Sequence, residues 1–343
     1  MGPRIVSLLA AVALLATTGL ARAEPRVALV VGNAHYATGE LATPANDAGL
    51  LAQELQTAGF DVVAGADLDL NGVRRSVREF IDKLAAAGPE ASAFVFIAGQ
   101  GVQFEGENYL VPVGSRIERA SDIPIESFRV ADLLRVLGTS GQARIVALDL
   151  ARPFPPLADN QPIAPGLALM EPPPGVLLAM SAGPEAVLPQ EAGPYGAYAT
   201  ALVEMLRQPG VQAGDLFARV RVRVHEATQG RQTPWHAGTL QARFAFYEPQ
   251  EEAAPAPQPA PPPRRGIADL PPSEAYALAI ERDTIAAYQD FLRTFPSDPM
   301  VPRIQRLLAA RREAIVWQRT VARNSPEAYW TYLRRYGDGP HAP

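Results

Sequence analysis

Several short runs of the sequence are apolar without interruption, and this feature constrains the fold more than any other. The run from Ala93 to Ala98 contains no polar residue, so it lacks the alternation of a strand with one solvated face. Similar runs end at Val31 and Met180, and a further one over 145–148 is followed by Asp149. Strands of this kind are buried on both faces, as in a mainly parallel sheet covered by helices on both sides. The sequence therefore predicts an α/β fold.

The segments between these runs fit the same fold class. Apolar residues at helical spacing predict one helix over 46–58 and another over 72–84. Residues 60–63 predict a further short strand, and 101–113 predict a β-hairpin. In parallel sheets ligands bind where strands end at their carboxyl edge, so we expect the functional residues there.

The N-terminus has the order of a secretory signal. Met1–Arg4 is basic, Ile5–Leu20 is almost wholly apolar, and Ala21–Ala23 forms an A-x-A cleavage pattern. The apolar run is shorter than the ~20 residues of a membrane-spanning helix. We expect residues 1–23 to be removed, leaving a periplasmic or secreted protein without a membrane span.

A proline-rich stretch divides the rest of the chain. Pro249–Pro263 contains seven prolines, a composition that favours an extended spacer over a packed core. We predict an N-terminal domain over 24–248, a linker over 249–266 and a C-terminal domain over 267–343.

The C-terminal segment contains an internal repeat. The pattern Ala287-Tyr288-x-x-Phe291-Leu292-x-x-Phe295 returns as Ala328-Tyr329-x-x-Tyr332-Leu333-x-x-Tyr336. Aromatic residues at this spacing share one face of a helix. The repeat resembles a tetratricopeptide-like helical hairpin, and a plain pair of packed amphipathic helices is the alternative.

Composition excludes some chemistry. The sequence has no cysteine, so it has neither a disulfide nor a thiolate nucleophile. Its 36 acidic and 31 basic residues give a net charge of −5, which argues against a nucleic-acid partner.

Six motifs in the order of the chain resemble those of the caspase-like peptidases, the group of caspases, metacaspases and orthocaspases. They are RVALVVGNAHY at 26–36, PANDA at 44–48, GFDV at 59–62, NYLVPV at 108–113, YGAY at 195–198 and GRQTPW at 230–235. The resemblance implies a caspase-hemoglobinase-like three-layer fold with a mainly parallel sheet of about six strands. It extends from the first strand to Phe246.

The residues that carry the family's chemistry are replaced. The resemblance implies a Gly-His-Gly turn with the general base after the third strand, and an Asp-x-Cys motif with the nucleophile after the fourth. This chain has Gly99-Gln100-Gly101 and Asp149-Leu150-Ala151 at those places. The amide of Gln100 cannot take a proton from a thiol, and the methyl group of Ala151 cannot attack a carbonyl. We therefore expect a catalytically inactive pseudo-orthocaspase.

A hydrolase with unconventional residues is one alternative. His35 follows the first strand at the carboxyl edge and Ser181 ends the fifth, so a Ser–His pair is conceivable. His225 falls in a predicted helix, His236 near a turn and His341 at the far end of the chain. No histidine spacing typical of zinc appears.

The resemblance also implies a specificity pocket for Arg or Lys lined by two acids. Their counterparts here are Asp47 and Asp149, with Ser181 at the end of the neighbouring strand. A guanidinium would satisfy two such carboxylates, so the expected ligand is a basic peptide or protein segment. The alternative is that Asp47 only favours a helix start and Asp149 only ends a strand.

Other expectations concern cofactors and partners. No cofactor is expected; calcium is possible by the resemblance, although Asp67-Leu68-Asp69 is a weak signal for a loop. An envelope protein could dock on the C-terminal helices, which would make the chain a scaffold. The resemblance places a sixth strand, a possible dimer edge, at Phe244–Phe246.

Overall fold

The computed structural model describes residues 24–137, 143–158, 161–189, 193–249, 266–323 and 325–337. The predicted signal segment and most of the predicted linker lie outside them, as does His341. Within the described residues, no helix is long and apolar enough to cross a membrane.

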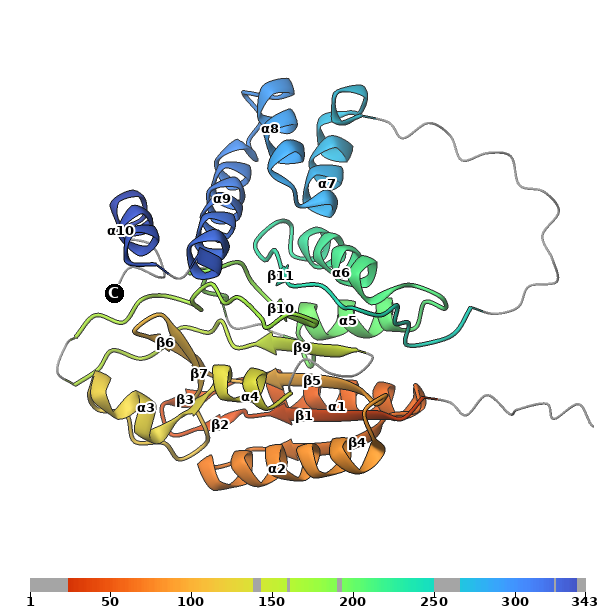
Figure 1. Cartoon of the computed structure of the whole chain (residues 1–343), viewed down its shortest axis with the longest axis vertical. Helices are drawn as coiled ribbons and strands as arrows, with labels where there is room; N and C mark the ends of the chain where they lie inside the picture. Colours follow the sequence, from red (N-terminus) through yellow and green to blue (C-terminus); the bar gives the residue numbers. More distant parts are fainter. Residues whose placement is uncertain are drawn as a thin grey trace, which may run out of the picture.

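A six-stranded sheet forms the centre of the molecule (Figure 1). Its order is β11-β10-β9-β5-β1-β4, and all neighbouring strands are parallel except β10 and β11. The strands are β1 (Arg26–Gly32), β4 (Asp61–Ala66), β5 (Ser92–Ala98), β9 (Arg144–Asp149), β10 (Val176–Met180) and β11 (Trp235–Ala237). The predicted mainly parallel α/β fold is confirmed.

Helices cover both faces of the sheet, which explains why the strand sequences are continuously apolar. One core contains alternate residues of the strands together with α1 (Pro44–Thr57), α5 (Ala197–Leu206) and α6 (Ala213–Ala227). The opposite core contains α2 (Leu70–Ala87) and α4 (Val130–Leu137). Because successive side chains of a strand point to opposite faces, sequence parity decides which core each residue enters.

Smaller elements lie at the carboxyl edge of the sheet. The predicted hairpin is formed by β6 (Gly101–Phe104) and β7 (Glu107–Leu110), with positive φ at both turn residues, Glu105 and Gly106. The other elements are β2 (His35–Tyr36), β3 (Gly39–Glu40), η1 (Ala120–Asp122), α3 (Ile123–Glu126) and β8 (Phe128–Arg129).

The sixth strand lies elsewhere than expected. It is β11, and it contains His236, which the sequence placed near a turn. Phe244 and Phe246 instead pack their rings on Phe60, and Ala245 makes only an isolated bridge to Gln212. Aromatic residues gain more from this core than from a sheet edge, where one face would stay solvated. The predicted edge at Phe244–Phe246 is therefore wrong.

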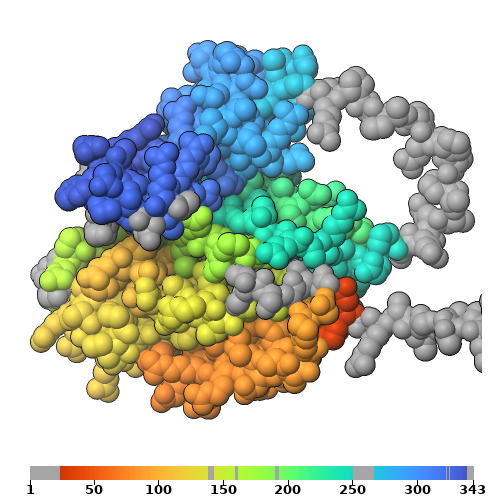
Figure 2. Space-filling model, in the orientation of Figure 1, coloured from red at the N-terminus to blue at the C-terminus, as the bar shows by residue number. Residues whose placement is uncertain are grey.

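The C-terminal helices pack against the β11 side of the sheet region (Figures 1 and 2). They are η2 (Ile267–Asp269), α7 (Pro272–Arg282), α8 (Ile285–Thr294), α9 (Val301–Arg323) and α10 (Pro326–Arg335). The two repeated patterns form α8 and α10. Each begins with the same cap, since the hydroxyls of Thr284 and Ser325 accept hydrogen bonds from the amides of Ala287 and Ala328.

Candidate functional site

The turn after β5 brings Gln100 next to the chain that follows β9. The Gln100 side chain is buried, and its Nε2 donates to the carbonyl oxygens of Pro153 at 3.1 Å and Arg152 at 3.4 Å. A side chain at Gly101 would come within 2.5 Å of the Leu150 oxygen, so only glycine allows this close approach. The two places at which the resemblance put the general base and the nucleophile, Gln100 and Ala151, are thus neighbours.

Ala151 itself faces an apolar environment. It is buried with Leu150 and Leu188 in the α2-side core, and its carbonyl accepts a hydrogen bond from Leu188 at 2.7 Å. Its methyl group offers neither a proton nor a lone pair. The hydrogen bond from Leu188 to Ala151 holds the segment after β10 against the chain after β9.

The three residues predicted to bind ligand share the opposite face. Asp149 is in alternation with Ile145 and Ala147 along its strand, and Ser181 is in alternation with Leu177 and Ala179. These four apolar residues all lie in the α1-side core. The Ser181 amide donates to Leu148 at 2.8 Å, so Ser181 continues β10 beside Asp149. The structure therefore places Asp149 and Ser181 on adjacent strand ends.

Asp47 approaches the same region from α1. It is fully buried, and its Oδ1 accepts a hydrogen bond from the amide of Gly196 at 2.8 Å. Gly196 is the N-cap residue of α5, so Asp47 stabilises the start of that helix rather than only its own. Two residues further along, the buried Tyr198 has its pKa raised by burial and by the charge of Asp149. Asp47 and Asp149 therefore both border the first turn of α5.

A cation already occupies this acidic region. Arg152 Nη2 lies 2.9 Å from Asp149 Oδ2, and the two side chains are only 4% and 1% exposed. Asp149 Oδ1 and the Ser181 hydroxyl are buried, and neither has a hydrogen-bond partner in the described part of the chain. The spacing of three residues between Asp149 and Arg152 is the signal in the sequence from which this ion pair could have been predicted.

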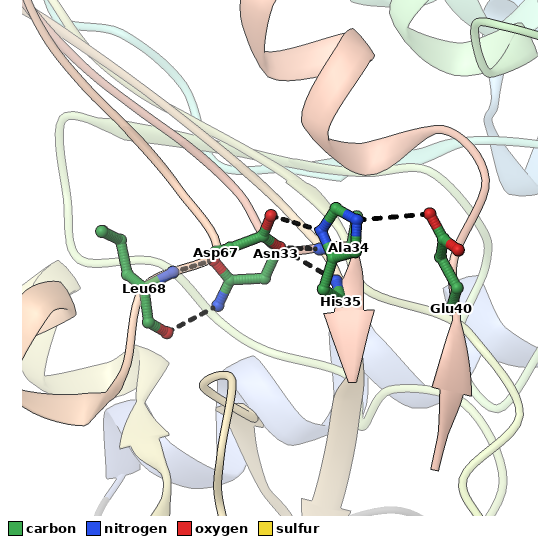
Figure 3. A network of polar contacts seen from close by, with 6 residues as sticks. All are labelled: Asn33, Ala34, His35, Glu40, Asp67 and Leu68. Carbon is green, nitrogen blue, oxygen red and sulfur yellow. Dashed lines mark hydrogen bonds and ion pairs between the residues drawn. The ribbon is translucent and has the colours of Figure 1, made fainter. Parts of the chain in front are cut away.

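His35 lies in a separate polar network at the β1–β4 end of the edge (Figure 3). Its Nδ1 is 2.5 Å from Asp67 Oδ2 and its Nε2 is 3.4 Å from Glu40. The hydrogen bond that His35 Nδ1 donates to Asp67, together with the negative charge of Asp67, raises the pKa of His35. Asp67 also accepts from the backbone amides of Ala34 and His35, so it organises the loop after β1.

The structure does not bring His35 and Ser181 together. They follow β1 and β10, which are separated by β5 and β9, or three strand spacings of ~4.8 Å each. His35 is turned toward Asp67, which follows β4 on the far side of β1. A Ser–His pair needs hydrogen-bond contact, and this arrangement offers none.

The comparisons identify the family. The caspase-domain family model of the C14 peptidases matches residues 25–245. The chain belongs to the caspase-domain family. A search of curated proteins found no match. The six-stranded sheet with helices on both faces is the architecture that the resemblance implied for this caspase domain.

The caspase domain shows no arrangement for a metal ion among its described residues, nor do the described C-terminal helices: no group of three or more His, Cys, Asp or Glu side chains is suitably placed. Asp67 binds His35, and Asp69 accepts a hydrogen bond from Gly72 at 2.6 Å as the N-cap of α2. The two aspartates considered for a calcium loop therefore have local structural roles.

Proposed function

We propose that this caspase-domain protein binds basic peptide or protein segments without cleaving them. The observation that supports the proposal is that Asp47, Asp149 and Ser181 are all buried and that Asp149 is paired with the guanidinium of Arg152. A site that holds the guanidinium of Arg152 has the charge and the hydrogen-bond acceptors to hold that of a ligand.

The absence of cleavage rests on the sequence and on the neighbourhood of two residues. The chain has no cysteine, and Gln100 and Ala151 stand where the family resemblance puts base and nucleophile. The Gln100 amide donates to the backbone after Ala151 instead of accepting a proton. Removing either member of a nucleophile–base pair costs roughly 10⁴-fold or more in rate.

Arg152 has a role in this proposal as an internal competitor. Its guanidinium pairs with Asp149, so an incoming Arg side chain has to displace it or share the carboxylate through Oδ1. Removing Arg152 and removing Asp149 should therefore change binding in opposite directions. A merely structural ion pair predicts no such opposition.

The test is fluorescence anisotropy of the purified chain with a labelled peptide that contains one arginine and with the same peptide containing citrulline. We expect the neutral citrulline peptide to bind roughly 10-fold more weakly or worse, because charge-assisted hydrogen bonds are lost. Asp149→Asn should weaken binding of the arginine peptide, and Arg152→Gln should strengthen it. Unchanged binding in Asp149→Asn would refute the pocket.

The chain contains a matched control pair with the same spacing. Arg135 Nη2 lies 2.8 Å from Asp132 Oδ1, but these side chains are 68% and 48% exposed on α4. Asp132→Asn and Arg135→Gln should leave both peptides unaffected. Mass spectrometry of the incubated peptide completes the test: cleavage that a single change in the cleft abolishes would overturn the proposed lack of hydrolysis.

A second candidate function is docking of an envelope protein on the C-terminal helices. The observation that favours it is Trp330 on α10, which is 64% exposed. Large exposed aromatic side chains are enriched where proteins bind partners. If this function is the right one, Trp330→Ser should abolish co-purification of a partner from an envelope extract, and Asp149→Asn should not.

A further inference from the structure

Buried arginines concentrate where α6 and β11 meet the C-terminal helices. Arg221 of α6 is 2% exposed; its Nε donates to Pro234 at 3.0 Å and its Nη1 to Ile280 at 3.1 Å. Its Nη2 lies 2.8 Å from Asp283 Oδ2. Arg311 of α9 pairs with the same carboxylate oxygen. We call this group of Arg221, Asp283, Arg311 and His236 the seam cluster.

The seam cluster carries an excess positive charge. Two guanidinium groups share the single carboxylate of Asp283, whose other oxygen accepts from the hydroxyl of Tyr288. His236 adds no charge to the cluster. Its Nδ1 lies 2.6 Å from Arg221 Nη2 and accepts a hydrogen bond from it, which requires a neutral ring. Burying an uncompensated charge is costly, and a bound anion would offset it.

A cavity of about 400 Å³ opens beside this cluster. Arg311 and Asp283 line it, and its other walls are mainly apolar, formed by Trp235, Trp317, Leu169, Met170, Ile285 and Ile315. The volume lies at the small end of the range for small-molecule sites, which is ~300–1,000 Å³. Such a cavity accepts a small organic molecule rather than a folded partner.

Two hydrogen-bond donors in the walls of this cavity lack acceptors. The Nε of Arg311 and the Nε1 of Trp235 are buried without a partner among the described residues. The guanidinium of Arg311 lies over the Trp235 ring, with its central carbon 4.1 Å from the ring centroid. Two adjacent residues of the cavity lining, Arg311 and Trp235, therefore contribute one guanidinium charge and two donors without acceptors.

We propose that this cavity binds a small organic monocarboxylate with a flat apolar body. Its carboxylate would accept from the Arg311 side of the cavity, and its body would lie against the tryptophan walls. One negative charge matches the single excess positive charge of the seam cluster, whereas a dianion such as a phosphate monoester would leave a buried negative charge. This site is separate from Asp47 and Asp149 and does not depend on the proposed peptide binding.

Glu171 adds a second carboxyl group, besides that of Asp283, to the lining of the cavity. Its partial burial there raises its pKa. Its carboxylate would repel that of a ligand at the mouth of the cavity. Glu171→Gln should therefore strengthen binding of a monocarboxylate and leave a neutral analogue unchanged.

The experiment is isothermal titration calorimetry of the full chain with phenylacetate, phenylacetamide and phenethylamine, which differ in charge and little in shape. Quenching of tryptophan fluorescence gives a second readout, since two of the three tryptophans line the cavity. We expect phenylacetate to bind roughly 10-fold or more tightly than the amide, and the amine not to bind. Equal affinities, or no saturable binding of phenylacetate in the millimolar range, would overturn the proposal.

The decisive variants lie on α9 and α8. Arg311→Gln should abolish the preference for phenylacetate, while Arg312→Gln, which removes an exposed neighbouring charge outside the cavity, should not change it. If Arg311→Gln does not fold by circular dichroism, Ala286→Phe decides: it fills the cavity mouth from an exposed position and should block phenylacetate while preserving the melting temperature. Binding that survives in Ala286→Phe would contradict the assigned cavity.

Discussion

The sheet region and the C-terminal helices bury charge in different ways. In the sheet region, Asp149 and Arg152 are three residues apart and balance each other. At the seam, Asp283 of the helical region meets Arg221 of α6 and Arg311 of α9, so the cluster is non-local and unbalanced. The first pair forms whenever one loop folds, whereas the second exists only when the helices are docked. The seam therefore couples the stability of the two regions.

The largest expected effect comes from Asp283→Asn. Asparagine tolerates the left-handed backbone that Asp283 adopts, with φ of 44°, so the change removes charge without adding strain. It leaves the buried guanidinium of Arg221 and the partly buried one of Arg311 without a carboxylate, and we expect the free energy of unfolding to fall by about 3–5 kcal/mol in urea denaturation.

Asp290→Asn is the control for that change. Asp290 pairs with Arg293 on the surface of α8, where an ion pair contributes about 0–1 kcal/mol. If the two variants lose equal stability, the seam cluster does not hold the two regions together.

A smaller effect is expected from the helix caps of the internal repeat. α8 packs on both α7 and α9, whereas α10 packs mainly on α9 at the end of the bundle. Thr284→Ala should reduce the free energy of unfolding by about 1 kcal/mol, and Ser325→Ala should mainly increase amide exchange within α10. Equal losses of global stability would show that α10 belongs to the same cooperative unit as α8.

The smallest effect concerns histidine titration, measured by NMR. The pKa of His35 should lie above its usual 6.5 because of Asp67, and that of His225 near 4 because of burial and Arg303. The pKa of His236 should also be well below 6.5, because of burial and the two seam arginines. At pH 5.5, about one unit below the usual histidine pKa, His35 should be protonated while His225 and His236 remain neutral.

The sign of the pH dependence follows from these directions. The stabilisation of the folded state by protonated His35 is fully present below pH 6.5 and is lost as the pH rises through its raised pKa. Below pH 6.5, His225 and His236 become protonated in the unfolded chain but stay neutral in the folded protein. The folded state should therefore lose stability as the pH falls toward 4. Asp67→Asn should lower the pKa of His35 toward 6.5. A pKa near 6.5 for His225 would contradict its burial in the protein.

Local patterns were sufficient for most of the sheet. The apolar runs ending at Val31, Ala98 and Met180 all became parallel strands, because a run without alternation is stable only when both faces are covered. The error at Phe244–Phe246 has a physical cause. Three consecutive apolar residues fit a strand or a packed loop equally well, and only the ring contacts with Phe60 decided between them.

The sequence alone determined the α/β class and the position of Asp149 and Ser181 at the ends of neighbouring strands, because continuous apolar runs and short motifs are local properties. Only the tertiary structure decided that His35 lies apart from Ser181. It also assembled Arg221, His236, Asp283 and Arg311 into one cluster. These contacts join residues far apart in the chain, and no periodicity of the sequence records which of many buried arginines meets which carboxylate.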